Sequence, residues 1–380
     1  FGSLEAAEGL VADGYAMLAR FGLTIPDASP QDHAALIAPQ LFAHTDTADS
    51  LPAPLSQTLP LVAAMENAFE ALGGRLLTRR SVIQITPVSP GAAAGRGRWV
   101  AHSRDANGAM GEIFAGNVVL AVGKAAMPWV VQCVQELGVD HEPAVTVDLG
   151  VRLETRRQDM AWMTRSCHYP KLTFLSARGE AVRTFCVCDG GRLMQYDFAG
   201  AVVLDGQHCI EDPTERTNFG ILTTVKAPPG LDAANYGLDI AKQVNARAGG
   251  GPMVQTVGDF LRERPTRSLD GAEVRSSLLR PVLGGLHDVL PASLAQDIKD
   301  MIDRLNRMSP GAVQDHALLA APVVERAFPQ ITLRPDMQSS RDGLYFIGDC
   351  SGKIIGITYG MATGLRAAHS IVAVGALAPA

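Results

Sequence analysis

Hydrophobic residues recur at helical spacing in two stretches of the first quarter of the chain, and glycine follows each stretch. Residues Leu4–Phe21 stop at Gly22, and residues Gln57–Leu72 stop at Gly73-Gly74. Apolar positions three and four residues apart lie on one side of a helix, and glycine is common just beyond a helix C-terminus. The pattern therefore predicts two amphipathic helices.

Short β-rich runs separated by turn residues come next. A strand is expected at about Leu76–Ile85. An Asn-Gly pair favours a hairpin, so Arg98–Arg104, residues 111–116 and Asn117–Val122 are predicted to form a three-stranded meander. The last of these is almost continuously apolar, which is typical of a strand buried on both faces. A helix is expected at Pro128–Leu137.

Beyond about residue 141 the chain changes to short alternating strands, which predicts a second, mostly antiparallel sheet. Residues Asn245–Pro252 are expected to form a loop, and helices are predicted at Leu294–Arg307 and Leu318–Phe328. A strand at Leu344–Ile347 and a long helix from about Ile357 end the pattern. We therefore predict an α/β protein with a β-rich insertion.

Composition narrows the class of protein. The chain has 380 residues, which suggests about two domains. Hydrophobic residues make up 47% and charged residues 19%, a globular composition. The net charge of −6 does not indicate the basic surface that nucleic-acid-binding proteins carry. No apolar run is long enough to span a membrane. Six cysteines without CxxC or zinc spacing predict free thiols, no metal site and a cytoplasmic location.

The C-terminal strand runs into a loop that contains Gly348, Asp349, Gly352 and Gly356. Glycine lets a ligand approach the backbone closely, and a helix N-terminus presents unpaired N–H groups to anionic oxygen atoms. An aspartate at the strand end can accept hydrogen bonds from sugar hydroxyls or backbone amides. The loop is thus a candidate ligand site, and a tight turn between strand and helix is the alternative.

This loop resembles the closing FAD-binding motif of two-domain flavoprotein oxidoreductases, in which Gly-Asp follows the last strand. The segment VVLAVG resembles the second shared motif of that class, and RSVIQI resembles the strand whose valine backbone meets the adenine. Four more segments resemble a family of bacterial FAD-dependent dehydrogenases with a glutathione-reductase-type, Rossmann-like fold: DLGVRLE (148–154), RTFCVCDGG (183–191), NFGIL (218–222) and VQTVGDFL (254–261). The resemblance extends from about residue 1 to residue 372.

The resemblance implies an FAD-dependent oxidoreductase that transfers a hydride to or from a small organic substrate, with an external electron donor or acceptor. It implies a discontinuous FAD domain at 1–140 and 316–380 and an inserted substrate domain at 141–315. The FAD contacts that it implies are Val82, Gly123, Gly348, Asp349, Gly352, Gly356 and Ile357.

The chain departs from the family at its start. The family opens with a strand, GxGxxG and a helix, which hold the FAD pyrophosphate, and this unit is absent here. Residue 1 is Phe and not Met. We expect a truncated N-terminus that lacks roughly 100 residues, the size of a βαβ unit with its linker. The alternative is a non-catalytic binding module that has lost flavin binding.

Four residues are candidates for a catalytic role. Lys353 stands where the family has an aromatic residue and paired glycines, and it could offset negative charge on a reduced flavin. Cys186 and Cys188 form a C-x-C pair on one face of a predicted strand. They could act as a redox pair, or they could be two small buried hydrophobic residues. His168 could donate a proton to substrate. A solvated lysine and structural roles for the other three are the alternatives.

Overall fold

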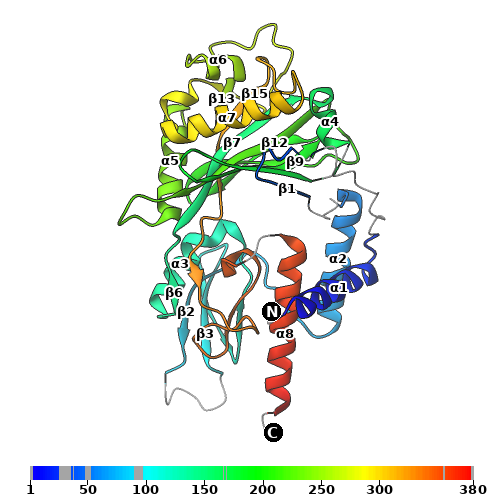
Figure 1. The fold of residues 1–380 in the computed structure, drawn as a ribbon. Helices are drawn as coiled ribbons and strands as arrows, with labels where there is room; N and C mark the ends of the chain where they lie inside the picture. Colours follow the sequence, from blue (N-terminus) through cyan, green and yellow to red (C-terminus); the bar gives the residue numbers. More distant parts are fainter. Residues whose placement is uncertain are drawn as a thin grey trace. The chain divides into compact units, whose positions relative to one another are not determined.

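The computed structural model describes residues 3–24, 36, 38–47, 53–89, 97–165, 167, 169–353 and 356–377. The chain divides into two compact units (Figure 1). The first unit comprises Phe1–Thr24, Ser56–Pro143 and Phe328–Ala380, and the second comprises Ile25–Leu55 and Ala144–Ala327.

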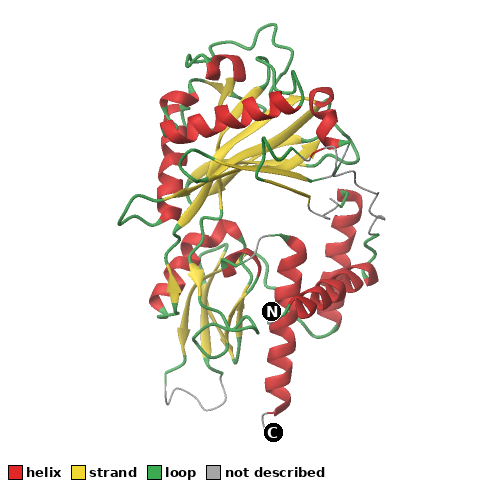
Figure 2. Cartoon of the chain, viewed as in Figure 1, coloured by secondary structure: helices red, strands yellow, loops and turns green. Residues whose placement is uncertain are grey.

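An eight-stranded sheet forms the centre of the second unit (Figure 2). All neighbouring strands pair antiparallel except the last two, which are parallel. In spatial order the strands are β1 (His44–Thr47), β8 (Pro170–Leu175), β9 (Ala181–Asp189), β12 (Arg216–Lys226), β7 (Thr146–Arg156), β15 (Leu318–Glu325), β13 (Met253–Thr256) and β14 (Val282–Leu283).

The two longest strands, β7 and β12, pair over their full length from Thr146↔Lys226 to Arg156↔Arg216. Nine of the eleven residues of β7 are buried. Strand β7 is buried along nearly its whole length because other elements cover both faces of the sheet.

Helices α5 (Ala233–Arg247) and α7 (Ala292–Met308) cover one face of the sheet. Alternation along β7 and β12 turns Leu149 and its cross-strand partner Thr223 to this face. The Thr223 hydroxyl donates to Asp297 on α7 over 3.1 Å. Gly237 of α5 lies so close to the sheet that a Cβ there would be 3.2 Å from Leu149 Cδ2.

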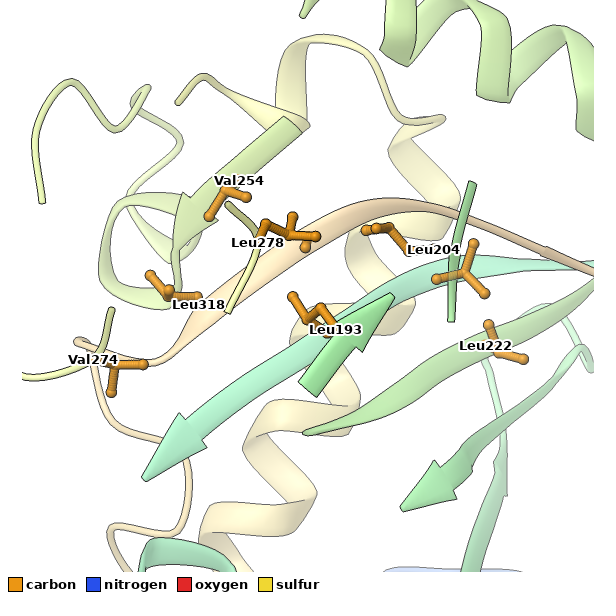
Figure 3. Packing of buried hydrophobic residues seen from close by; sticks show 9 residues of the cluster. Leu193, Leu204, Leu222, Val254, Val274, Leu278 and Leu318 are labelled. Atoms are coloured by element: carbon orange, nitrogen blue, oxygen red, sulfur yellow. The ribbon is translucent and has the colours of Figure 1, made fainter. Parts of the chain in front are cut away.

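A two-stranded antiparallel ribbon, β10 (Arg192–Phe198) and β11 (Ala201–Gln207), packs on the other face. Its apolar side chains join a core cluster with side chains of the sheet and of the 274–278 segment (Figure 3). The buried members of the cluster are Leu193, Leu204, Leu222, Val254, Val274, Leu278, Leu318, Ala320 and Val323.

In the first unit, α1 (Leu4–Arg20) packs against α8 (Ile357–Leu377). A Cβ at Gly14 of α1 would be 3.3 Å from Met361 Cε, so the small residue permits this approach. The remaining elements of this unit are α2 (Leu55–Ala71), the antiparallel sheet β2 (Arg80–Pro87), β3 (Trp99–Asp105) and β4 (Met110–Ala115), the parallel pair β5 (Val118–Leu120) and β17 (Leu344–Phe346), the pair β6 (His141–Glu142) and β16 (Gln330–Ile331), and α3 (Met127–Glu136).

Most predicted elements are confirmed, and four predictions are wrong. The predicted strand Asn117–Val122 is not buried on both faces, because Val119 is 40% exposed and Val122 is 39% exposed. The predicted helix Leu318–Phe328 is wrong: Leu318–Glu325 form the buried strand β15, because a short apolar run has no periodicity that separates strand from helix. The meander consists of β2, β3 and β4, and β5 instead pairs with β17. Residues Asn245–Arg247 belong to the end of α5 and not to a loop.

Two segments lie in the second unit although the sequence placed them in the first domain. Strand β1 pairs with β8, and β15 pairs with β7 and β13. The unit boundaries therefore fall at 143/144 and 327/328, with residues 25–55 in the second unit. Long-range pairing of this kind has no local signal in the chain.

Within the described residues, no helix has the length and apolarity needed to cross a membrane.

Truncating Leu222 to alanine is expected to lower the free energy of unfolding by about 2–5 kcal/mol, because the lost side chain leaves a cavity between sheet and ribbon. Leu279 is fully exposed, so Leu279→Ala is the matched control and should change the value by less than about 0.5 kcal/mol. Urea unfolding followed by circular dichroism measures both. Equal effects of the two substitutions would contradict the packing described here.

Candidate functional site

The parallel pair β5 and β17 places two predicted glycines beside each other in the first unit. The strands run in register from Leu344↔Val118 to Phe346↔Leu120, and the Ile347 amide donates to the Leu120 carbonyl over 3.0 Å. Gly123 and Gly348 therefore follow the carboxyl ends of adjacent parallel strands. Ligands of open α/β sheets bind at this edge.

The loop after β17 is fixed to helix α8 and to β5. Gly348 has φ 61°, a conformation that glycine adopts without strain, and its amide donates to Thr363 Oγ1 of α8 over 3.0 Å. The buried Cys350 thiol donates to the Leu120 carbonyl over 3.0 Å, and burial raises its pKa. Cys350 was not predicted as a site residue; its protonated thiol holds the loop against β5.

Asp349 links the loop to the start of α8. Its Oδ1 accepts from the Gly356 amide over 3.4 Å, and Ile357, the first residue of the helix, is 84% exposed. Among the described residues, no atom would lie within 4 Å of a Cβ placed at Gly123 or at Gly356. The loop therefore leaves open space next to a half-buried carboxylate and the amides of a helix N-terminus.

The remaining predicted residues of the first unit lie apart from this arrangement or on its surface. Gly352 caps the turn over Gly348–Ser351 with φ 69°, and a Cβ there would be 2.2 Å from the Pro329 carbonyl. Lys353 is exposed. Val82 is 40% exposed on β2, in the separate three-stranded sheet.

A second polar site, not predicted as a whole, is buried in the second unit. We call it the Arg152 cluster. It comprises Arg152, Tyr169, Cys188, Asp205, His208 and Asn218. Alternation turns Arg152 and Asn218 to the face that the β10–β11 ribbon covers, and both are fully buried.

The Arg152 guanidinium makes several contacts in this cluster. It donates to the Cys186 carbonyl over 2.9 Å, to Asn218 Oδ1, and to Asp205 Oδ1 over 3.4 Å. A Cβ at Gly206 would be 1.9 Å from Arg152 Nη2, so the ribbon must carry glycine there. Arg152 Nε and Asn218 Nδ2 have no hydrogen-bond partner among the described residues.

A series of side-chain contacts in the cluster connects Tyr169 to His208 and His208 to Cys188. The Tyr169 hydroxyl lies 2.5 Å from His208 Nε2, which lies 3.5 Å from Cys188 Sγ. Burial, and then the nearby Arg152 charge, lowers the pKa of His208. Burial raises the pKa of Tyr169. The imidazole is therefore neutral near pH 7, and the tyrosine is protonated.

The two cysteines of the C-x-C pair border the same cluster. A β-bulge interrupts β9 between the pairs Gly220↔Phe185 and Asn218↔Cys188, and Cys186 has φ 40°. Burial raises the pKa of Cys186 to about 12 and also raises that of Cys188. All six cysteines are free. Both thiols are protonated near neutral pH, which disfavours nucleophilic thiol chemistry. His168 lies outside the described residues.

Sequence reasoning missed most of this cluster because its members come from five separate segments. Only the register of β7, β9 and β12 and the position of the ribbon bring them together. One local signal existed: Arg152 sits in the middle of β7, where charged residues alternate with apolar ones. A charged residue in that position indicates a buried polar network.

Comparisons with known proteins give one family match. Residues 148–325 match the family described as "FAD-dependent protein, C-terminal domain-like", and all of them lie in the second unit. None of the curated proteins matches the chain. The structure titled "Crystal structure of AlpK" is similar with a TM-score of 0.29 and 12% identity, over 94% of this chain and 58% of that chain. The chain thus spans less than two thirds of that protein, and a TM-score this low defines no shared fold.

The lowered pKa of His208 predicts a pH-dependent stability. The ordinary pKa of histidine is about 6.5, and below that pH His208 binds a proton in the unfolded chain but not in the folded one. The free energy of unfolding therefore falls as the pH falls from 6.5 towards the pKa of His208 in the folded protein. His208→Gln should lose less stability than the parent protein between pH 7 and pH 5, as measured by urea unfolding at each pH. Parallel pH profiles for the two proteins would show that His208 is not buried as a neutral imidazole.

Proposed function

We propose that this protein is an FAD-dependent oxidoreductase of the dehydrogenase type, acting on a small organic substrate. The observation that carries the proposal is the match of residues 148–325 to a domain family of FAD-dependent proteins. The glycine loop of the first unit supports it, because its Gly-Asp segment follows a parallel strand and leads into a long helix. The two features come from different parts of the chain.

The residues of the loop have the chemistry that FAD requires. Gly123 and Gly356 both face open space as far as the described residues show. Within the described residues, one carboxylate oxygen of Asp349, Oδ1, accepts a hydrogen bond, from the Gly356 amide. The other carboxylate oxygen, Oδ2, can accept hydrogen bonds from the ribityl hydroxyls of FAD. The exposed amides at Ile357 suit phosphate or pyrimidine oxygens. In the proposal, Gly348 and Gly352 shape the loop, and Val82 meets the adenosine end.

Bound FAD would supply hydride transfer, and the protein would supply binding, orientation and electrostatics. Thr363 and Cys350 hold the loop backbone in place through the Gly348 amide and the Leu120 carbonyl. Asp349 fixes the loop to the first turn of α8. Lys353, exposed at the end of the loop, is the candidate that would offset charge on the reduced flavin. An external electron donor or acceptor completes the proposed reaction.

A binding module without flavin is the second candidate. Thiol redox chemistry at Cys186 and Cys188 is less well supported, since burial keeps both thiols protonated. These alternatives differ from the proposal in one respect that is simple to measure. Only the flavoenzyme needs FAD to bind through Asp349.

FAD titration of the purified chain, followed by quenching of flavin fluorescence, tests the proposal. We expect saturable binding that Asp349→Ala weakens about tenfold or more, because a hydrogen bond to a charged group is lost. Asp349→Asn, which keeps an acceptor, should lose less. Asp13 is an exposed carboxylate on α1, and Asp13→Ala is the matched control with unchanged affinity. Equal affinities of the parent chain and Asp349→Ala, or absent binding both in this chain and in the product of the complete gene, would reject the proposed site.

The expectation of an upstream phosphate-binding unit stays a prediction with its own test. The product of the complete gene and the chain described here are compared for FAD affinity. A much higher affinity in the longer protein would support an upstream unit that holds the pyrophosphate. Equal affinity in both would show that this chain binds the whole cofactor by itself.

A further inference from the structure

A cavity of about 640 Å³ in the second unit is lined by four arginines. Arg156 ends β7, Arg157 follows it, Arg216 begins β12, and Arg275 lies in the segment that leads to the core residue Leu278. Cavities that hold small molecules have volumes of about 300–1,000 Å³. This cavity has the size of a ligand site, and charged side chains dominate its walls.

Two of the four guanidinium groups are held by carboxylates. Arg156 donates to both oxygens of Asp159 over 3.0 Å and also pairs with Glu273. Arg157 donates twice to Asp189 Oδ2, over 3.0 and 2.6 Å. These ion pairs fix the positions of the two arginines, and their three carboxylates outweigh the two positive charges. They build the wall of the cavity and add little net attraction for a ligand.

The other two guanidinium groups are not neutralised in this way. Arg216 uses its Nε to donate to the Arg275 carbonyl over 2.7 Å. In the described part of the chain, no residue accepts from its terminal Nη groups, and none accepts from the Arg275 side chain. Glu154 is near enough to Arg216 to interact electrostatically, yet both its oxygens accept from the Ser277 amide.

The planar donor fork of arginine matches carboxylate and phosphate oxygens in pairs. Arg216 and Arg275 together offer two such forks at one cavity. Two exposed glutamates also line the cavity: Glu273, which pairs with Arg156, and Glu215, which opposes the binding of an anion. A ligand with a single negative charge gains little against this carboxylate, whereas one with two or more anionic groups can engage both free forks.

We propose that this cavity is a binding site for a small multivalent anion that carries at least two phosphate or carboxylate groups. Arg216 and Arg275 make its principal contacts, and Arg156 and Arg157 shape the wall. The site lies entirely within the second unit, and the proposal does not depend on flavin binding in the first.

Isothermal titration calorimetry of the full chain at neutral pH and low ionic strength tests this site, with inorganic pyrophosphate and citrate as probes. Saturable binding of at least one probe is expected. Arg216→Gln and Arg275→Gln should each weaken it about tenfold, as the loss of a charge-assisted contact predicts. Glu215→Gln should tighten it about threefold, because it removes a repulsive charge. The probe that binds more tightly identifies phosphate or carboxylate as the preferred group.

Arg247→Gln is the matched control, since Arg247 is an exposed arginine on α5 that does not line this cavity. It should leave the affinity unchanged, and circular dichroism of every variant verifies folding. Failure of both probes to bind would overturn the proposal. So would an equal loss in Arg247→Gln, which would indicate nonspecific attraction. A Glu215→Gln variant that binds no more tightly would also overturn it, because it would show that the anion does not bind beside Glu215.

Discussion

The full-length pairing of β7 with β12 is the constraint on which the second unit depends. Every other strand of the sheet is added on one side or the other of this pair. The register from Thr146↔Lys226 to Arg156↔Arg216 decides which side chains face the helices and which face the ribbon. A shift of one residue would exchange the two faces and bury the charged residues of β7 against α5 and α7.

That register also explains why charged residues tolerate burial in this sheet. Asp148, Arg152 and Glu154 alternate on the ribbon face of β7, and each has partners supplied by other elements. Asp148 pairs with Arg183, Arg152 contacts Asn218, and Glu154 accepts from the Ser277 amide. Removing one partner of such a buried group costs more than the contact gains, because the remaining charge stays desolvated. The polar network thus restricts the sheet to one arrangement.

Local features of the structure followed from the sequence, and long-range ones did not. The helices at 4–20 and 357–377 have clear apolar spacing, and the glycine loop between β17 and α8 has a recognisable residue order. Strand β15 was predicted as a helix because its seven consecutive apolar residues carry no period. The Arg152 cluster was missed because Tyr169 and His208 meet Arg152 only after β8, β11 and β7 have assembled. The bulge at Cys186 likewise depends on pairing with β12.

The central claim is that FAD binds at the carboxyl ends of β5 and β17. Hydrogen–deuterium exchange with and without FAD measures this directly along the whole chain. We expect slower amide hydrogen exchange on FAD addition at residues 121–126 and 347–360, which include the two strand ends and the start of α8. Unchanged exchange in both segments at saturating FAD, or protection confined to other parts of the chain, would contradict it.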